Sequence, residues 1–414
     1  MKNKLHKILR WSEKYTQTDM VYLAKSGFWS NANFILVNIF SFFLSIAFAR
    51  FLTKAEYGTY QFILSISSIL VALTLTGMNT AVTQAVARGL EGSLKKSIPV
   101  QLKHNVIPFL VGLTLSIYYL VHGNITLGVG VLFISFLLPI YNTFNTYTAY
   151  LLGKRDFKTG FWFGQGVNIP YYSIMILSIY YIKDPLYLVL VNFGINTLLS
   201  IFFYYYTLHK YKPNREEDPA TMRYGKELSL INVLGMASSQ IDSLLVFHYI
   251  GAVELAVYTF ATTLPERLTG LLKIITVAAF PQFAKQTRKE LQPSIISKSL
   301  RLALLTFVFS LVYIIFAPLF FKILYPQYMG SVFYSQIYAM LLVIASLSSL
   351  PLAALTATKS KKELYIYNII TPITTIIIMI LLMKFFGIWG LILSRGISNI
   401  LNFIILLLLW KIQK

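Results

Sequence analysis

The sequence contains no cysteine, and its charged residues are few. Without cysteine the chain cannot form a disulfide framework, a thiol nucleophile or a cysteine-ligated metal site. Its five histidines are scattered and lack the spacing of metal ligands, so neither a metal nor another cofactor is expected. Only 12% of residues are charged and 56% are hydrophobic, which excludes a soluble domain of ordinary composition. We therefore expect an all-α polytopic membrane protein.

Long apolar runs follow one another along almost the whole chain. Windows of roughly 20 apolar residues predict about twelve transmembrane helices. Their expected limits are 28–52, 57–83, 98–121, 125–152, 159–182, 186–208, 228–250, 255–283, 298–321, 332–358, 364–385 and 389–410. Residues 1–26 precede them and alternate Lys or Arg with apolar residues, which is typical of a basic amphipathic helix on a membrane surface. A disordered tail is the alternative for this segment.

The two halves of the chain contain a repeat. Glu254-Leu-Ala-Val-Tyr258 resembles Glu56-Tyr-Gly-Thr-Tyr60, and each lies in a short turn between two apolar runs. The runs that precede the turns, 36–52 and 234–250, align at the same offset. This pattern predicts two similar six-helix lobes. The predicted organisation is an N-terminal lobe at 27–208, a cytoplasmic linker at 209–227 and a C-terminal lobe at 228–414.

Basic residues fall mostly on one side of the predicted membrane. Lys and Arg number 36 against 15 acidic residues, which gives a net charge of +21. The side opposite the N-terminus holds only Arg50, Lys54, Lys183, Lys322 and Lys384. The positive-inside rule therefore predicts cytoplasmic termini in a cell membrane, and the charge indicates contact with anionic lipids and not with nucleic acid.

The chain also lacks features that an enzyme or a pump would need. The loops on the outer side are very short, which argues against a membrane-embedded glycan-processing enzyme with catalytic groups on a large outer loop. No G-x-x-x-x-G-K-[ST] motif is present, so an ATP-driven pump is not expected. A transporter without catalytic residues is the class that remains.

Polar side chains recur at helical spacing in several predicted spans. The sets are Thr76, Asn79, Thr80 and Thr83; Asn142, Asn145 and Thr146; Gln165, Asn168 and Tyr172; and Arg395, Asn399 and Asn402. Each set lies on one face of its helix. Bonds between helices are one explanation. Because several such faces occur together with buried cations, a polar cavity is favoured, and Asn79, Asn145, Gln165 and Asn399 become candidate sugar-binding residues.

Charges also lie within predicted spans. An ionisable side chain at bilayer depth costs about 3 kcal/mol on insertion scales and usually faces a bundle interior or a cavity. Three cations, Arg267, Lys273 and Arg395, stand against two acids, Asp242 and Glu266, which favours an anionic substrate. We expect Glu266 to pair with Arg267, or Asp242 with either cation of its region. Asp242 is also a candidate for coupling to a proton or sodium ion, and Asp242 and Glu266 together for charge balance. Alternatively, both acids neutralise cations structurally, while Lys273 extends toward the interface.

Three segments carry a family resemblance. They are Phe48-Ala-Arg-Phe-Leu-Thr-Lys-Ala-Glu-Tyr-Gly-Thr-Tyr60, the region 241–258, and Ala279-Phe-Pro-Gln-Phe283. They resemble the polysaccharide transporter family, the O-antigen-type flippases of the multidrug/oligosaccharidyl-lipid/polysaccharide (MOP) exporter superfamily. The resemblance implies two six-helix lobes around a central cavity with alternating access. It also implies a polyprenyl-pyrophosphate-linked oligosaccharide as substrate.

The resemblance also bears on the site and the partners. Arg50 matches an arginine near the outer end of the first helix, and Arg267 lies where related lipid flippases place a phosphate-binding arginine. With Lys273 and Arg395 these form the candidate pyrophosphate site. Candidate partners are membrane lipids, a polysaccharide polymerase and chain-length machinery. A peptidoglycan-precursor flippase, which commonly has fourteen helices, and a multidrug exporter, which needs acids for cationic drugs, are the alternatives.

Overall fold

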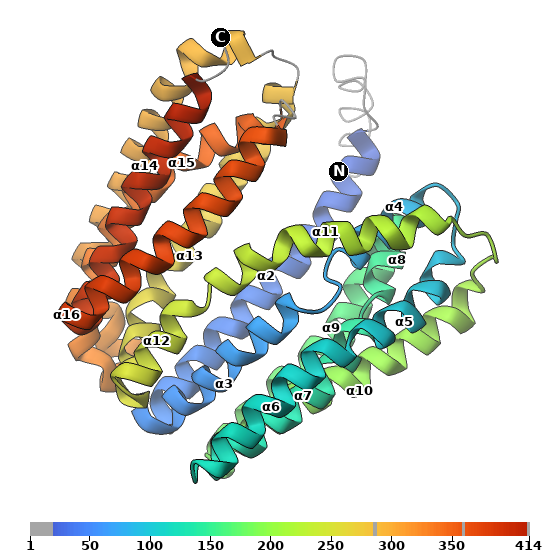
Figure 1. The fold of residues 1–414 in the computed structure, drawn as a ribbon, viewed down its shortest axis with the longest axis horizontal. Coiled ribbons are helices and arrows are strands. Elements are labelled where there is room, and N and C mark those ends of the chain that lie inside the picture. The colour runs from blue at the N-terminus through green and yellow to red at the C-terminus, as the bar shows by residue number, and fades with distance from the viewer. Residues whose placement is uncertain (1–19, 285–287, 358–360, 412–414) are drawn as a thin grey trace, which may run out of the picture. The chain divides into compact units, whose positions relative to one another are not determined.

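The computed structural model of the chain describes residues 20–284, 288–357 and 361–411 (Figure 1). Within these ranges every regular element is a helix, which confirms the predicted all-α class. Eight helical segments are long and apolar enough to cross a membrane, the most hydrophobic being Lys362–Trp410. The protein is therefore a multi-pass membrane protein. Most of the predicted amphipathic segment 1–26 lies outside the described residues.

The described parts of all predicted spans are helical, but four of these spans each contain two helices. They are 57–83, 98–121, 125–152 and 228–250, which break near residues 73–77, 105, 145–146 and 239–240. Conversely, predicted spans 364–385 and 389–410 form one element, α16 (Lys361–Lys411). Gly387 kinks it with φ 57° and ψ −135°, a conformation that essentially only glycine adopts. Hydropathy located the apolar stretches, whereas local turns set the breaks.

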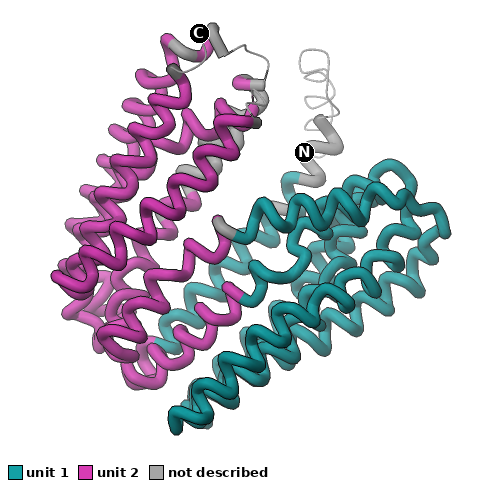
Figure 2. The backbone as a smooth tube through the Cα atoms, viewed as in Figure 1, with its two compact units in different colours: residues 1–48, 70–233 teal, residues 49–69, 234–414 magenta. Residues whose placement is uncertain are grey.

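The helices form two compact units (Figure 2). Unit 1 comprises residues 1–48 and 70–233, and unit 2 comprises residues 49–69 and 234–414. Three helices contribute residues to both units: α2 (Met20–Phe51), α3 (Lys54–Ala72) and α11 (Pro219–Ser238). These units are defined by contacts and the predicted lobes by the repeat, so their limits differ. The lobe division stays a prediction.

Unit 1 is built around paired helices. Its remaining elements are α4 (Met78–Ala87), α5 (Ser93–His104), α6 (Val106–Val121), α7 (Ile125–Phe144), α8 (Tyr147–Gly153), α9 (Phe157–Tyr181), α10 (Pro185–Tyr211) and most of α11 (Pro219–Ser238). Helix α7 packs against both α6 and α10, and α8 packs against α4 (Figure 1). Aromatic side chains such as Tyr147, Tyr150 and Phe163 are buried in the core that these helices share. That core holds the short helices α4 and α8 in place beside the pocket described below.

Unit 2 centres on α15 (Val332–Ala357), which packs against α13, α14 and α16. The other elements are α12 (Ile241–Tyr249), α13 (Ala252–Ala284), α14 (Arg288–Leu324) and a 3-10 helix, η1 (Pro326–Ser331). Leu350 and Leu355 of α15 are buried with Leu406 and Trp410 of α16. Apolar packing thus joins helices that supply the charged residues of this unit.

The repeated turns of the sequence fold alike. The first turn follows Phe51 at the end of α2, and the second follows Tyr249 at the end of α12. The Tyr57 amide donates to the Thr53 carbonyl at 3.0 Å, and the matched Leu255 amide donates to the Gly251 carbonyl at 3.1 Å. Both turns therefore begin their second helix with the same hydrogen bond. This agreement supports the repeat that the sequence predicted.

Both turns belong to unit 2, and their helices approach closely there. A Cβ atom at Gly58 would lie 1.8 Å from the Ala252 carbonyl oxygen, so only glycine permits this separation of α3 and α13. Phe62 stacks on Phe247 with ring centroids 3.8 Å apart. Glycine and aromatic stacking together fix the contact between the two repeats.

The start of α4 is fixed by a similar glycine contact. The Gly77 amide donates to the Ser229 hydroxyl of α11 at 2.9 Å, which satisfies a donor at the break after α3. A Cβ at Gly77 would lie 2.7 Å from both the Gly225 carbonyl oxygen and the Ser229 amide nitrogen. The predicted span 57–83 is broken here, and α11 lies against the break.

The segment between α10 and α11 is fastened to the loop that follows α4. Asn214 donates through Nδ2 to the Gly89 carbonyl at 2.8 Å, and its Oδ1 accepts from the Glu91 amide at 3.1 Å. Glu91 in turn accepts from Lys154 Nζ at 2.6 Å and from the Tyr150 hydroxyl at 2.7 Å. Burial disfavours ionisation of Glu91, but these two hydrogen bonds and the Lys154 charge outweigh it and lower its pKa. Asn214 of the predicted linker is thus hydrogen-bonded to the loop that follows α4.

Candidate functional site

A buried ion pair joins three helices of unit 2. Asp242 lies in the first turn of α12, where a carboxylate is favoured by the helix dipole. Its Oδ1 accepts from the Ser243 amide at 2.9 Å. Its Oδ2 accepts from the Tyr258 hydroxyl of α13 at 2.7 Å and from Arg395 Nη2 of α16 at 2.5 Å. Both oxygens of Asp242 are thus hydrogen-bonded within the protein.

Arg395, unlike Asp242, keeps hydrogen-bonding groups that are not satisfied within the described residues. The Asp242 side chain is 8% accessible, whereas that of Arg395 is 28% accessible. Arg395 Nε is buried and has no hydrogen-bond acceptor among the described residues. A guanidinium has five N–H donors in a fixed fork, and one carboxylate oxygen does not satisfy them. The arrangement holds an arginine in a fixed position with donors left for an anion.

The other charged residues predicted for the site, Glu266, Arg267 and Lys273, lie on α13. Glu266 is exposed and accepts from the Tyr338 hydroxyl of α15 at 2.9 Å. Arg267 is partly buried, and the side chain of Lys273 lies outside the described residues. The structure pairs Asp242 with Arg395, a partner far away in sequence. Among the described residues Asp242 thus pairs with Arg395 and not with a cation of α13, while the expected pairing of Glu266 with Arg267 stays a prediction.

Arg50 caps the C-terminal end of α14 by a hydrogen bond. It is exposed in the last turn of α2, and its Nη2 donates to the Ile323 carbonyl at 2.6 Å. A basic side chain at this position satisfies a terminal carbonyl of α14 and complements its dipole. Gln327 of η1 donates to the Arg50 carbonyl at 3.3 Å. Arg50 therefore has a structural contact in unit 2, and its role in binding substrate stays a prediction.

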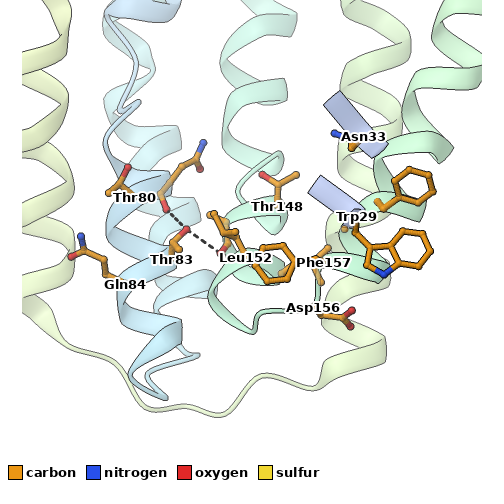
Figure 3. Close-up of a pocket in the computed structure, with 14 residues that line it drawn as sticks. Trp29, Asn33, Thr80, Thr83, Gln84, Thr148, Leu152, Asp156 and Phe157 are labelled. Carbon is orange, nitrogen blue, oxygen red and sulfur yellow. Dashed lines mark hydrogen bonds between the residues drawn. The ribbon is translucent and has the colours of Figure 1, made fainter. Parts of the chain in front are cut away.

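A second feature is a pocket of about 560 Å³ within unit 1 (Figure 3). Helices α2, α4, α8 and α9 line it. The lining residues are Trp29, Asn33, Asn79, Thr80, Thr83, Gln84, Thr148, Ala149, Leu151, Leu152, Asp156, Phe157, Gly160 and Phe161. Thr83 ties α4 to α8 by donating to the Asn79 and Ala149 carbonyls at 2.9 and 3.1 Å. This hydrogen bond between α4 and α8 fixes the two short helices whose polar residues line the pocket.

Two predicted sugar-binding residues belong to this region. Asn79 lines the pocket, and its buried Oδ1 has no hydrogen-bond partner in the part of the chain that the structure describes. Gln165 of α9 lies behind the pocket and donates to Asn33 Oδ1 at 2.8 Å. Trp29 and Phe161 form an aromatic wall with ring centroids 5.0 Å apart. Of the predicted sugar-binding residues, Asn79 therefore lines the pocket, and Gln165 holds the lining residue Asn33 by a hydrogen bond.

The other two predicted amides lie elsewhere. Asn145 is partly buried at the break between α7 and α8, and Asn399 lies one turn after Arg395 in α16. Part of the predicted polar faces does make bonds between helices, as the alternative proposed. Thr146, for example, accepts from Gln101 of α5 at 3.0 Å.

Several pocket residues were not predicted from sequence. Trp29 and Asn33 are four residues apart and share a face of α2, which was the available signal. Thr148 and Phe161 showed no such pattern with them. They line the pocket because α8 packs against α4 and α9 packs against α8.

Comparison with solved structures finds a similar helical fold in several transporters. It is similar to the lipid II flippase MurJ in an inward closed conformation, with a TM-score of 0.68 at 14% identity, covering 91% of this chain and 86% of that one. It is also similar to an inward-facing MATE-family multidrug transporter of the MOP superfamily, with a TM-score of 0.61 at 14% identity, covering 91% and 96%. A MOP superfamily transporter from Pyrococcus furiosus, whose binding pocket is described as having reversed polarity, has a TM-score of 0.51 at 13% identity, covering 93% of each chain. At these identities the similarity establishes the fold.

The family follows from the sequence itself. A family model described as polysaccharide biosynthesis protein matches residues 23–287. The chain therefore belongs to this family of polysaccharide biosynthesis proteins. No curated protein matches the chain by sequence. Family and fold together support a flippase or exporter, and the solved neighbours named above are transporters.

Proposed function

We propose that the protein is a flippase for polyprenyl-pyrophosphate-linked oligosaccharide repeat units. It moves them by alternating access from the cytoplasmic to the outer leaflet of the cell membrane, for cell-surface polysaccharide biosynthesis. The observation that carries this proposal is the state of Arg395, which is held by Asp242 yet keeps a buried, unpartnered Nε. A pyrophosphate supplies the acceptors that such an arginine lacks. The family description agrees with a carrier for polysaccharide precursors.

The proposed roles divide by chemistry. Arg395 holds the pyrophosphate, with Arg267 and Lys273 as further cations on α13 and Arg50 nearer the predicted outer end. Asn79, Asn145, Gln165 and Asn399 are assigned to the sugars. Asp242 and Glu266 balance the cations, and Asp242 is the candidate coupling residue.

The proposal extends to location and partners. We place both termini and the linker in the cytoplasm, as the distribution of Lys and Arg indicates. A polysaccharide polymerase and chain-length machinery are the proposed partners, since each acts on the repeat unit after it reaches the outer leaflet.

Complementation in cells that lack their own polysaccharide flippase tests the proposal. Surface glycan is measured by antibody binding to intact cells, and membrane abundance by immunoblot. Arg395→Gln removes both charge and fork and is expected to abolish export at normal abundance. Arg395→Lys keeps the charge without the fork and is expected to be partly active. Normal export by Arg395→Gln would show that the phosphate is held elsewhere.

The competing function needs its own test because MurJ has a similar fold. The gene is expressed in cells depleted of their lipid II flippase, and growth is recorded. We expect no rescue, because the proposed substrate carries an oligosaccharide repeat unit and not a peptidoglycan precursor. Full rescue of growth together with failure to export polysaccharide would replace the proposed function with the alternative.

A further inference from the structure

We propose that the pocket of unit 1 binds uncharged sugar rings of the transported glycan, separately from the arginine that binds its phosphate. This inference rests on the proposed function for the identity of the ligand, and it adds the location and charge class of a sugar site. Its geometry is independent of Arg395, because all of the lining residues belong to unit 1 and Arg395 belongs to unit 2.

The size of the pocket fits a small ligand. Ligand pockets in proteins are commonly about 300–1,000 Å³, and this one, at about 560 Å³, lies within that range. Gly160 in its wall has open space where a side chain would project. The pocket can therefore admit one or two pyranose rings.

The charge of the lining selects a neutral ligand. None of the described lining residues is Lys, Arg or His, so the pocket offers no cation for a phosphate or uronate. Its one acid, Asp156, is already engaged: Oδ1 accepts from the Thr159 amide at 3.0 Å, and Oδ2 accepts from the Thr159 and Tyr211 hydroxyls at 2.8 and 2.5 Å. Burial disfavours its ionisation, but the hydrogen bonds from Tyr211 and Thr159 outweigh this and lower its pKa. Asp156 thus caps α9 and has little capacity left for a cationic drug.

The polar groups and rings of the lining match a sugar. An amide supplies both donors and an acceptor, which suits vicinal hydroxyls. Asn79 Oδ1 is such an acceptor, buried and without a partner among the described residues, and the exposed side chains of Thr80 and Gln84 are on the same helix, α4. Across the pocket, Trp29 and Phe161 provide apolar ring faces for the C–H face of a pyranose. An acyl chain would leave Asn79 unsatisfied, which is costly at a buried site.

The pocket also lies where a cytoplasmic headgroup would enter. It is at the end of unit 1 where α4 and α8 finish and α9 begins. The loops at this end, after Ala87 and after Gly153, are among those that the charge distribution predicts to be cytoplasmic. A sugar bound here would be recognised as the lipid-linked substrate is loaded.

Trp29 provides a direct reporter of binding. The chain has five tryptophans, so Trp11, Trp162, Trp389 and Trp410 are replaced by Phe to leave Trp29 alone. The full-length variant is purified into lipid nanodiscs, and its emission is titrated with maltotriose, a neutral trisaccharide, and with trigalacturonate, an anionic one. We expect maltotriose to shift the Trp29 emission saturably and trigalacturonate to bind at least about tenfold more weakly.

A matched reporter and a pocket variant provide the controls. A protein that retains only Trp162 carries its reporter on α9, where that side chain is 58% exposed and outside the lining, so no saturable change is expected. Asn79→Leu keeps side-chain volume and removes the amide. In the Trp29 protein it should weaken maltotriose binding by about tenfold, which corresponds to about 1.4 kcal/mol.

The outcomes separate this inference from the proposed function. No saturable response of Trp29, an equal response of Trp162, or equal binding of trigalacturonate would each overturn the neutral sugar site. A tighter response to tetraphenylphosphonium than to maltotriose would overturn it in favour of a cationic drug. Loss of the proposed function would appear instead as export that is independent of Arg395, whatever Trp29 reports.

Discussion

The ion pair between Asp242 and Arg395 provides the most direct test of the charged site. Asp242→Asn preserves the shape of the side chain and removes the charge that faces Arg395. The amide oxygen can still accept from both the Tyr258 hydroxyl and Arg395, so the substitution removes the charge that faces Arg395 and the acceptor of the Ser243 amide. We expect the variant to be less stable than the wild type and to have an arginine that is less well held.

The expected size follows from burial. Removing one partner of a fully buried ion pair costs about 3–5 kcal/mol, because the remaining charge is left uncompensated. Arg395 is 28% accessible, so water screens part of its charge and the cost should fall to about 2 kcal/mol. A loss of that size changes the ratio of folded to unfolded protein by roughly thirtyfold. Tyr258→Phe removes one hydrogen bond and should cost less, about 1 kcal/mol.

Thermal unfolding of the four proteins of a double-mutant cycle measures this coupling. Asp242→Asn, Arg395→Gln and the double variant are compared with the wild type in the same detergent. The double variant should be less destabilised than the sum of the two single variants, because it contains no unpaired charge. Additive effects would refute the argument, since they would mean that the two side chains do not interact in the folded protein.

The same variants separate stability from transport. Replacing both partners with apolar residues, as in Asp242→Leu with Arg395→Met, should be near neutral in stability because no charge stays buried. It should still abolish export if Arg395 holds the phosphate. Asp242→Asn alone tests coupling: flipping that keeps its wild-type dependence on pH and sodium gradients would exclude Asp242 as the coupling residue.

Three further predictions concern topology, pH and helix packing. Arg215→Cys in the linker should react with an impermeant maleimide only after permeabilisation, whereas His122→Cys should react in intact cells; the reverse result would invert the topology. Glu91→Gln should lower the thermal midpoint most at neutral pH. Because the pKa of Glu91 is lowered in the folded protein, its carboxylate stabilises the fold above the ordinary pKa, and this stabilisation is lost as the pH falls through the lowered pKa. A difference between the variant and the wild type that does not depend on pH would contradict this. Gly77→Ala should destabilise by about 1–3 kcal/mol because its methyl group meets backbone, whereas Gly194→Ala in open space should be neutral or stabilising; equal effects in unfolding scans would rule out the close packing of α4 on α11.

The sequence predicted the structure best for the membrane-spanning helices, whose positions depend on the average hydrophobicity of a segment. Apolar runs located the helices because the bilayer imposes hydrophobicity along a whole span. The repeat located both turns, since Tyr57 and the matched Leu255 make the same backbone bond. The break at Gly77 was not predicted, because it depends on a hydrogen bond and a close contact with α11, which is distant in sequence.

The candidate site shows the same limit more clearly. Periodicity singled out Asp242 and Arg395 separately, but no local pattern connects α12 with α16. The pocket likewise depends on four helices. Its lining residues extend from Trp29 in α2 to Phe161 in α9, so no local pattern connects them. Hydropathy reports which residues avoid water, whereas partners across the fold depend on how the helices pack.

The repeat itself supplies the strongest argument that the charge of Asp242 is functional. Asp242 matches Leu44, and Tyr258 matches Tyr60 at the same offset. Leu44 and Tyr60 are buried in the first repeat, which forms its turn without an acid at the matched position. The backbone of the repeat therefore does not require a carboxylate there. In the second repeat the carboxylate instead accompanies Arg395, whose buried Nε has no acceptor among the described residues, and an arginine held in this way agrees with the proposed binding of an anionic substrate.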